Sequence, residues 1–309
     1  MTGVRPGWVA PLALLGAVCL WGLTPPATRL LVEDSFSPAH ILLWRFLAGG
    51  LLSLGIIAAF RPALPARRDF GLAIALGLFG VLGFNVPLAF GVDLIESGIA
   101  SLLLGTQPGF TALAAALYLR EHISGRMIAG LGIALAGTVM VAFAGATGVE
   151  LTGGYVAGCM LVLLAALAYS VYTVVAKPHL GARIPPTSVA LIGTTAAFPF
   201  ALPFGASGFG DAIASLDLGG WLAAILLAAG ASVFAPILFH VGLSLGRASN
   251  AGVYLYLNPI FGAVASVILL GEELPVLAAL GGALVIAGVA VATLPTSLLR
   301  RSRRREVGT

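Results

Sequence analysis

Two amide side chains interrupt long apolar runs, and each stands directly before a proline. Gln107–Pro108 lies within ESGIASLLLGTQPGFTALAAALYL, and Asn258–Pro259 lies within LYLNPIF. A proline removes one backbone hydrogen bond and frees a carbonyl about one turn earlier, while an amide side chain can both donate and accept. Such a pair in an apolar helix could bind a polar ligand, or it could join neighbouring helices. The residues alone leave both roles open.

Other candidate substrate-binding residues are amide, hydroxyl and aromatic side chains within apolar runs. Tyr254 lies about one turn before Asn258, so the two side chains share a helix face. A third amide, Asn85, lies just before Pro87. Aromatic rings at this depth can stack on a substrate, although they more often pack or lie at the membrane interface. The predicted substrate-binding residues are Gln107, Asn258, Asn85, Trp21, Thr24, Tyr169, Tyr172 and Tyr254.

The composition identifies the class of protein. The chain has 309 residues, of which 59% are hydrophobic and 9% are charged, whereas soluble domains carry about 25% charged residues. We therefore predict an all-α membrane protein. A helix needs about 20 apolar residues to cross the hydrocarbon core. Polar, glycine and proline breaks divide the chain into ten predicted transmembrane helices, at 10–32, 38–60, 70–92, 97–119, 125–145, 154–176, 186–205, 220–243, 249–270 and 275–295.

The charged residues predict how these helices are oriented. If the N-terminus is cytoplasmic, 14 of the 16 Lys and Arg residues fall in cytoplasmic loops or in the two termini. Nine of the twelve acidic residues then fall on the outer side. Positive charge is concentrated on the cytoplasmic side of membrane proteins, so we predict that both termini are cytoplasmic. The basic tail at 300–309 is expected to anchor this topology at the lipid surface and not to bind nucleic acid.

The chain also contains a repeat. A shift of 151 residues lays GVDLIESGIASLLLGTQPGF, which starts at Gly91, over GLSLGRASNAGVYLYLNPIF, which starts at Gly242. The two amide–proline pairs then coincide. The position that matches Arg45 in the second copy is Gly193, so Arg45 is not one of a symmetric pair.

The repeat predicts the architecture of the membrane domain. We predict two five-helix repeats, at 1–148 and 149–299, followed by the tail. Because five is odd, the second repeat enters the membrane from the opposite side. Inverted repeats of this kind are typical of secondary transporters, whose substrate sites lie near the midplane where the repeats meet.

Several motifs follow one another along the chain, and two of them, the polar residue before proline and the glutamate before a glycine-rich helix, occur in both halves. They are Trp-Gly in the first helix, a proline and then an arginine in the second, a polar residue before proline in the fourth and ninth, and a glutamate ahead of a glycine-rich helix. This pattern resembles the EamA-type family of the drug/metabolite transporter superfamily, and it is similar to bacterial amino-acid exporters. The residues that carry the resemblance are Trp21, Gly22, Pro38, Arg45, Gln107, Glu121, Asn258 and Glu272.

The resemblance implies export of small metabolites, most simply amino acids, across the inner membrane through a central cavity, with no cofactor. It does not determine the substrate, so drugs and nucleosides are alternatives. A membrane-embedded lipid-linked transferase is a further alternative, but the loops are short and have few groups for acid–base chemistry. No phosphate-binding GxxxxGK[ST] loop or metal-ligand cluster occurs in the sequence.

The acidic residues lie at helix ends, in loops or in the tail. Because coupled pumps usually keep a carboxylate within the membrane, this distribution favours facilitated diffusion or exchange, with a proton relay at His240 as the alternative. Arg45 is expected to extend to the interface or to pair with Glu33 or Asp34, with direct contact to a substrate carboxylate as the alternative. Glycines at matching seven-residue spacing, in 125–145 and 275–295, predict that these two helices pack closely together as a scaffold.

Overall fold

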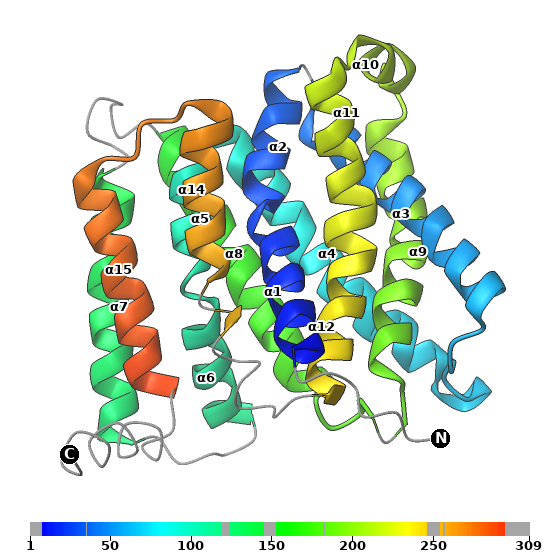
Figure 1. Ribbon diagram of the computed structural model, residues 1–309, viewed down its shortest axis with the longest axis horizontal. Coiled ribbons are helices and arrows are strands. Elements are labelled where there is room, and N and C mark those ends of the chain that lie inside the picture. The colour runs from blue at the N-terminus through cyan, green and yellow to red at the C-terminus, as the bar shows by residue number, and fades with distance from the viewer. Residues whose placement is uncertain are drawn as a thin grey trace.

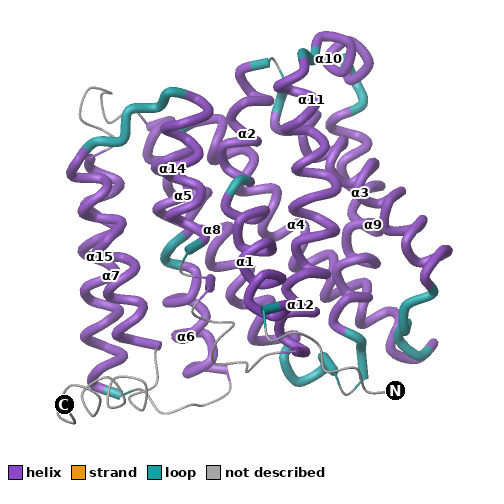
Figure 2. Tube along the Cα trace, viewed as in Figure 1, coloured by secondary structure: helices purple, strands orange, loops and turns teal. Residues whose placement is uncertain are grey.

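Helices make up the whole fold (Figures 1 and 2). The structure is a computed structural model that describes residues 8–34, 36–118, 124–144, 153–181, 183–245, 254–255 and 257–293. Apart from an isolated bridge between Leu180 and Ile184, these residues form no β pairing. The prediction of an all-α protein is confirmed for this part of the chain.

The helices follow the predicted spans, but several of them are divided. In the part that corresponds to the first repeat they are α1 (Val9–Gly22), α2 (Thr24–Glu33), α3 (Pro38–Phe60), α4 (Arg67–Leu94), α5 (Ser97–Leu104), α6 (Gln107–Tyr118) and α7 (Gly125–Ala144). The later helices are α8 (Gly153–Ala176), α9 (Pro186–Gly205), α10 (Phe209–Ser215), α11 (Leu218–Ile225), the π-helix η1 (Leu226–Phe234), α12 (Ala235–Leu245), α14 (Asn258–Leu270) and α15 (Val276–Thr293).

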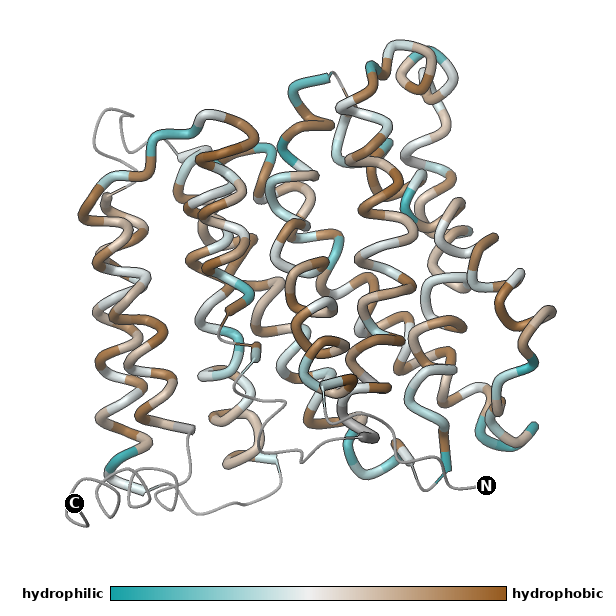
Figure 3. The backbone as a smooth tube through the Cα atoms, in the orientation of Figure 1, coloured by the Kyte–Doolittle hydropathy of each residue, from teal (hydrophilic) through white to brown (hydrophobic). Residues whose placement is uncertain are grey.

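Seven helical stretches in the described part are long and apolar enough to cross a membrane, which makes this a multi-pass membrane protein. Many hydrophilic residues lie at helix ends and in loops, while the helices themselves are largely apolar (Figure 3). The count of ten helices and the cytoplasmic placement of both termini remain predictions. The seven stretches are Val9–Glu33, Pro38–Phe60, Arg67–Leu94, Ser97–Tyr118, Gly125–Ala144, Gly153–Ala176 and Leu218–Phe239.

Helices α7 and α15 pack backbone to backbone at one edge of the molecule (Figure 1). A Cβ atom added at Gly130 would lie 2.5 Å from the Gly288 carbonyl oxygen, and one added at Gly137 would lie 2.6 Å from that of Gly281. Small residues allow such an approach because no side chain separates the backbones. The predicted close packing of these two helices is confirmed.

Helix α4 lies at the centre of the fold and packs against both α8 and α9. It crosses α9 where Gly77 meets Gly193, since a Cβ atom added at Gly193 would lie 2.6 Å from the Gly77 Cα. This contact explains why glycine stands at the position that matches Arg45. A side chain there would separate α4 from α9.

Candidate functional site

Three helices begin at a polar residue followed by proline. The first two residues are Thr24–Pro25 in α2, Gln107–Pro108 in α6 and Asn258–Pro259 in α14. Proline is favoured in the first turn of a helix because its missing N–H would have no partner there. The same residues end the preceding helix, so the stretches Val9–Glu33 and Ser97–Tyr118 are each broken partway along their length.

The three breaks meet in space. A Cβ atom added at Gly22 would lie 2.8 Å from the carbonyl oxygen of Asn258 and 3.2 Å from its Oδ1. One added at Gly105 would lie 3.4 Å from Pro259 Cγ. The break between α1 and α2 therefore touches the start of α14, which in turn touches the break between α5 and α6. We call this meeting point the junction, formed by residues 22–24, 105–108 and 257–259.

The polar groups at the junction differ in how well they are satisfied. The Gln107 carbonyl accepts hydrogen bonds from Ser170 Oγ at 2.9 Å and from Thr111 Oγ1 at 3.0 Å. In contrast, the Oδ1 of Asn258 is buried and has no hydrogen-bond partner among the described residues. A buried acceptor without a partner costs about 1–3 kcal/mol, so Asn258 offers an acceptor that a ligand would satisfy.

A second polar group lies between α4 and α8. The Tyr169 ring contacts the rings of Phe84 and Tyr172, with centroids 5.4 and 5.5 Å apart. Asn85 is buried, and its Nδ2 donates to the Val81 carbonyl at 2.7 Å, while its Oδ1 has no partner in the described part of the chain. These side chains come from α4 and α8, and α8 also packs against α6.

Trp21 is bound to the π-helix. Its Nε1 donates to the Ala231 carbonyl at 3.1 Å, and its ring contacts Phe239. At the end of η1 the Ala235 N–H donates to Gly230, five residues back. The next residue, Pro236, has no N–H to donate to Ala231. The indole supplies that donor, so Trp21 has a packing role beside the junction.

The structure thus brings together only some of the predicted substrate-binding residues. Thr24, Gln107 and Asn258 form the junction, with Trp21 directly before it. Tyr254 lies before Asn258, and the Leu257 N–H donates to its carbonyl at 2.9 Å. The α4–α8 group is Asn85, Tyr169 and Tyr172.

Two features of the structure, the helix break at Leu23 and the π-helix η1, were not predicted from the sequence. The break at Leu23 could have been predicted from Pro25–Pro26, by the same reasoning that identified the other two breaks. The π-helix leaves a weaker signal, Pro236. The predictions for Glu121 and the tail at 300–309 fall outside the described residues, as does the side chain of His240.

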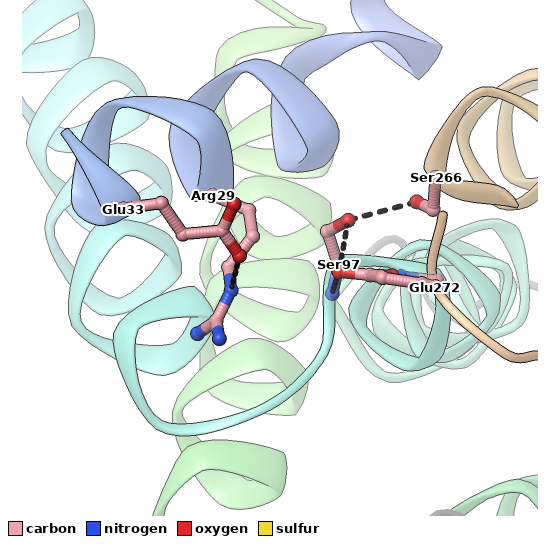
Figure 4. Close-up of polar contacts among 6 residues, drawn as sticks. Arg29, Glu33, Ser97, Ser266 and Glu272 are labelled. Carbon is pink, nitrogen blue, oxygen red and sulfur yellow. Dashed lines mark hydrogen bonds and ion pairs between the residues drawn. The ribbon is translucent and has the colours of Figure 1, made fainter. Parts of the chain in front are cut away.

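A carboxylate joins two helices of the junction at one end of the molecule. Glu272 Oε1 accepts from the N–H and the Oγ of Ser97, both at 2.9 Å, and its Oε2 accepts from the Gly98 N–H at 2.8 Å (Figure 4). Ser97 Oγ also lies 2.8 Å from Ser266 Oγ. A carboxylate at a helix N-terminus is stabilising because it pairs with unsatisfied N–H groups. Glu272 therefore holds the start of α5 to the end of α14.

Other titratable side chains, those of Arg29, Glu33 and Glu96, lie near the Ser97–Glu272 contact. Arg29 pairs with Glu33 at 3.0 Å close by (Figure 4). Burial raises the pKa of the Glu96 carboxyl, and the charge of Glu272 raises it further.

An ion pair holds the N-terminal end of α4, at the end of the molecule opposite the Ser97–Glu272 contact. Asp69, in the first turn of α4, is buried and pairs with Arg183, from the loop before α9. Arg68 lies 3.5 Å from the same carboxylate. Because α4 runs from Asp69 toward Ser97, the two ends of the molecule each carry a polar contact.

The expectation that Arg45 extends to the interface or pairs with Glu33 or Asp34 is wrong. Arg45 is only 6% exposed, and its Nε donates to Ser232 Oγ in η1 at 2.7 Å. Glu33 pairs with Arg29 instead. The reason is the close packing of α3 against η1, which brings the guanidinium to Ser232 inside the fold.

Two apolar hollows lie elsewhere on the molecule. One, of about 250 Å³, lies between α6 and α8 and includes Phe110 and Leu167, and the other, of about 200 Å³, lies along α14 and includes Val264 and Ile268. Their linings include exposed apolar side chains, as expected where lipid contacts protein. Neither hollow opens onto the junction.

Comparison with known proteins gives a consistent result. The profile of the EamA-like transporter family matches residues 8–143 and again residues 156–294. A probable terminal-alkyne amino-acid exporter of Streptantibioticus cattleyicolor is 30% identical, over 96% of both chains. A probable amino-acid metabolite efflux pump of Salmonella typhimurium is 26% identical, over 94% of this chain and 97% of that protein. The uncharacterized transporter YdfC of Bacillus subtilis is 27% identical, over 91% and 90%.

A solved crystal structure has the same fold. It superimposes with a TM-score of 0.65 over 92% of this chain and 98% of the other, at 23% sequence identity. At that identity the likeness supports the fold alone.

Proposed function

Because the chain belongs to the EamA-like transporter family of the drug/metabolite transporter superfamily, we propose that it exports amino acids across the inner membrane by alternating access. Relatives named as amino-acid exporters align with it over nearly their whole length. The observation that carries the proposal is the junction, where three helices begin at polar residues and the Asn258 acceptor has no partner among the described residues.

The chemistry of the junction suits a small zwitterion. Helix N-termini carry partial positive charge and unsatisfied N–H groups, which favour a negatively charged group. A buried amide oxygen favours a donor such as an ammonium group. Broken helices that meet within the membrane supply both in transporters built from inverted repeats.

The two ends of the molecule suggest how access alternates. The Ser97–Glu272 contact holds α5 against α14 at one end, and the Asp69–Arg183 pair holds the other. We propose that the inverted repeats at 1–148 and 149–299 move against each other, so that these contacts open in turn. The family profile matches twice, on either side of this division, which supports the proposal.

Transport is proposed to be uncoupled or to proceed by exchange. The acidic residues that the structure describes lie at helix ends or in loops, as Asp69 and Glu272 illustrate. A proton- or sodium-driven carrier usually needs a carboxylate inside the membrane.

Flux in proteoliposomes tests the proposal. Purified protein would be tested with labelled leucine and other amino acids, with and without a pH gradient, beside a Gln107→Ala, Asn258→Ala double variant. Saturable flux that is independent of the gradient, and lost in the double variant, is expected. The control is Ile268→Ala, since Ile268 lies on the same helix as Asn258 but is 73% exposed. Folded protein that moves no amino acid would contradict the proposal, and nucleosides and cationic drugs would then be tested.

A further inference from the structure

Arg45 is a buried cation without an anionic partner among the residues that the structure describes. It is 6% exposed and lies within α3, a helix that is apolar enough to cross the membrane. Its one hydrogen bond in the described part of the chain is to Ser232 Oγ, at 2.7 Å, and no described carboxylate forms an ion pair with it. A charge at this depth is costly unless it is paired or lines a polar route.

Ser232 fixes the guanidinium but does not neutralise it. Its Oγ donates to the Leu227 carbonyl, five residues back in the π-helix, at 2.8 Å, so the same oxygen is oriented to accept from Arg45. A guanidinium has five N–H donors, and the Ser232 contact uses only the one on Nε. The two Nη groups form the fork that binds a carboxylate through two parallel hydrogen bonds.

Two residues near Arg45 on α3, Gly49 and Trp44, hold this part of the helix close to η1 and α11. At Gly49, one turn after Arg45 on α3, an added Cβ would lie 2.9 Å from the Ala228 carbonyl oxygen. Trp44 donates from Nε1 to the Ala224 carbonyl at 2.9 Å. These contacts hold α3 against α11 and η1, so the guanidinium cannot extend to the interface as an arginine on a lipid-facing helix would.

The same turn of η1 connects Arg45 to the junction. Ala231, the neighbour of Ser232, accepts from Trp21 Nε1 at 3.1 Å. Trp21 is followed by Gly22, which packs directly on Asn258. Trp21 thus links Arg45, which has no ion-pair partner in the described structure, to Asn258 Oδ1, which has no hydrogen-bond partner there. π-Helical segments are rare, and those that occur are frequently at functional sites.

We propose that Arg45 binds the carboxylate of the transported molecule, which makes carboxylate-bearing molecules the substrate class. The inference rests on the proposed function, and it adds a specificity-determining residue that the junction does not contain. The guanidinium fork binds the carboxylate through two parallel hydrogen bonds. A molecule without a carboxylate leaves Arg45 buried and unpaired, so it binds more weakly.

Equilibrium binding to the purified full-length protein tests this assignment, with labelled leucine and labelled leucinamide as probes. Leucinamide keeps the amine and the side chain of leucine but lacks the carboxylate. Wild-type protein is expected to prefer leucine, and Arg45→Gln to weaken leucine binding by at least about tenfold while leaving the weaker leucinamide binding unchanged. The matched control is Arg29→Gln, which removes an arginine that already pairs with Glu33 and is expected to bind leucine like wild type.

Three outcomes would overturn the proposal: wild-type protein that does not prefer leucine, an Arg45→Gln variant with unchanged leucine affinity, or equal weakening of both probes. The last would indicate that Arg45 only supports η1. If Arg45→Gln does not fold, Arg45→Lys provides the test, because lysine keeps the positive charge but cannot form the bidentate hydrogen bonds of a guanidinium. It is expected to bind leucine more weakly than wild type, and wild-type affinity would overturn the proposal.

Binding and flux separate this inference from the proposed function. Protein that binds leucine through Arg45 but carries no flux would contradict amino-acid export and leave the carboxylate site standing. Flux with no preference between leucine and leucinamide would overturn the carboxylate site and leave transport standing.

Discussion

The edge formed by α7 and α15 and the junction both contain residues that disfavour helix formation, glycine and proline, but with different results. At the edge, glycines such as Gly137 bring two continuous helices into backbone contact. At the junction, prolines interrupt helices, and the acceptor of Asn258 has no partner in the described structure. The comparison suggests that glycine alone marks scaffold, whereas a polar residue before proline marks the site. Departures from local consistency of the second kind are expected where a protein functions.

The largest expected effect is at the edge. Gly137→Leu should prevent α7 from packing on α15, because even a Cβ atom there would lie 2.6 Å from the Gly281 carbonyl oxygen. We expect little monodisperse protein by gel filtration. The control is Gly132→Leu on the same helix, where an added Cβ meets nothing within 4 Å. Equal yields of the two variants would show that the edge is not a scaffold.

Asn258→Ala, unlike Gly137→Leu, should impair transport and not folding. Flux should fall by at least about tenfold, while thermal stability should stay the same or rise by up to about 1 kcal/mol, because an acceptor with no described partner is removed. Flux in proteoliposomes and thermal unfolding of the same preparation would measure the two effects. A stable variant with wild-type flux would remove Asn258 from the site.

Gln107→Ala should reduce flux by less, on the order of a few-fold. In the described part of the chain the hydrogen bonds of Gln107 to Ser170 and Thr111 are made by its backbone carbonyl, which the substitution keeps, so both hydroxyls would still donate to it. Comparing the two single variants measures how unequal the two halves of the junction are. Equal losses of flux would indicate a symmetric site.

The smallest effect concerns pH at the Glu272 end. Burial and the charge of Glu272 raise the pKa of Glu96 above its ordinary value, so the folded protein holds this proton more tightly than the unfolded chain. The resulting stability is fully present below the ordinary pKa and is lost as pH rises through the raised one. Melting temperature should therefore fall slightly as pH rises above the ordinary glutamate pKa of about 4.3 in wild type relative to Glu96→Gln. Parallel profiles would show that Glu96 does not contribute.

Local signals predicted much of this molecule. Low charge and long apolar runs indicated a membrane protein, and proline marked the breaks at Gln107 and Asn258 because it acts on its own helix. The glycine spacing in α7 and α15 predicted their contact. The partner of Arg45 could not be predicted, since it depends on a π-helix 187 residues away. The first break was overlooked because an apolar run continues across Leu23.

The most direct test of the account is whether the junction lies on the transport route. An Asn258→Cys substitution would be made with Cys19→Ala and Cys159→Ala, the two native cysteines being removed. A membrane-impermeant thiol reagent would then be applied from each face. We expect labelling from the face opposite the Ser97–Glu272 contact, protection by leucine, and new labelling from the Glu272 face when Glu272→Gln is added. A thiol that reacts from neither face, or that leucine never protects, would contradict the account.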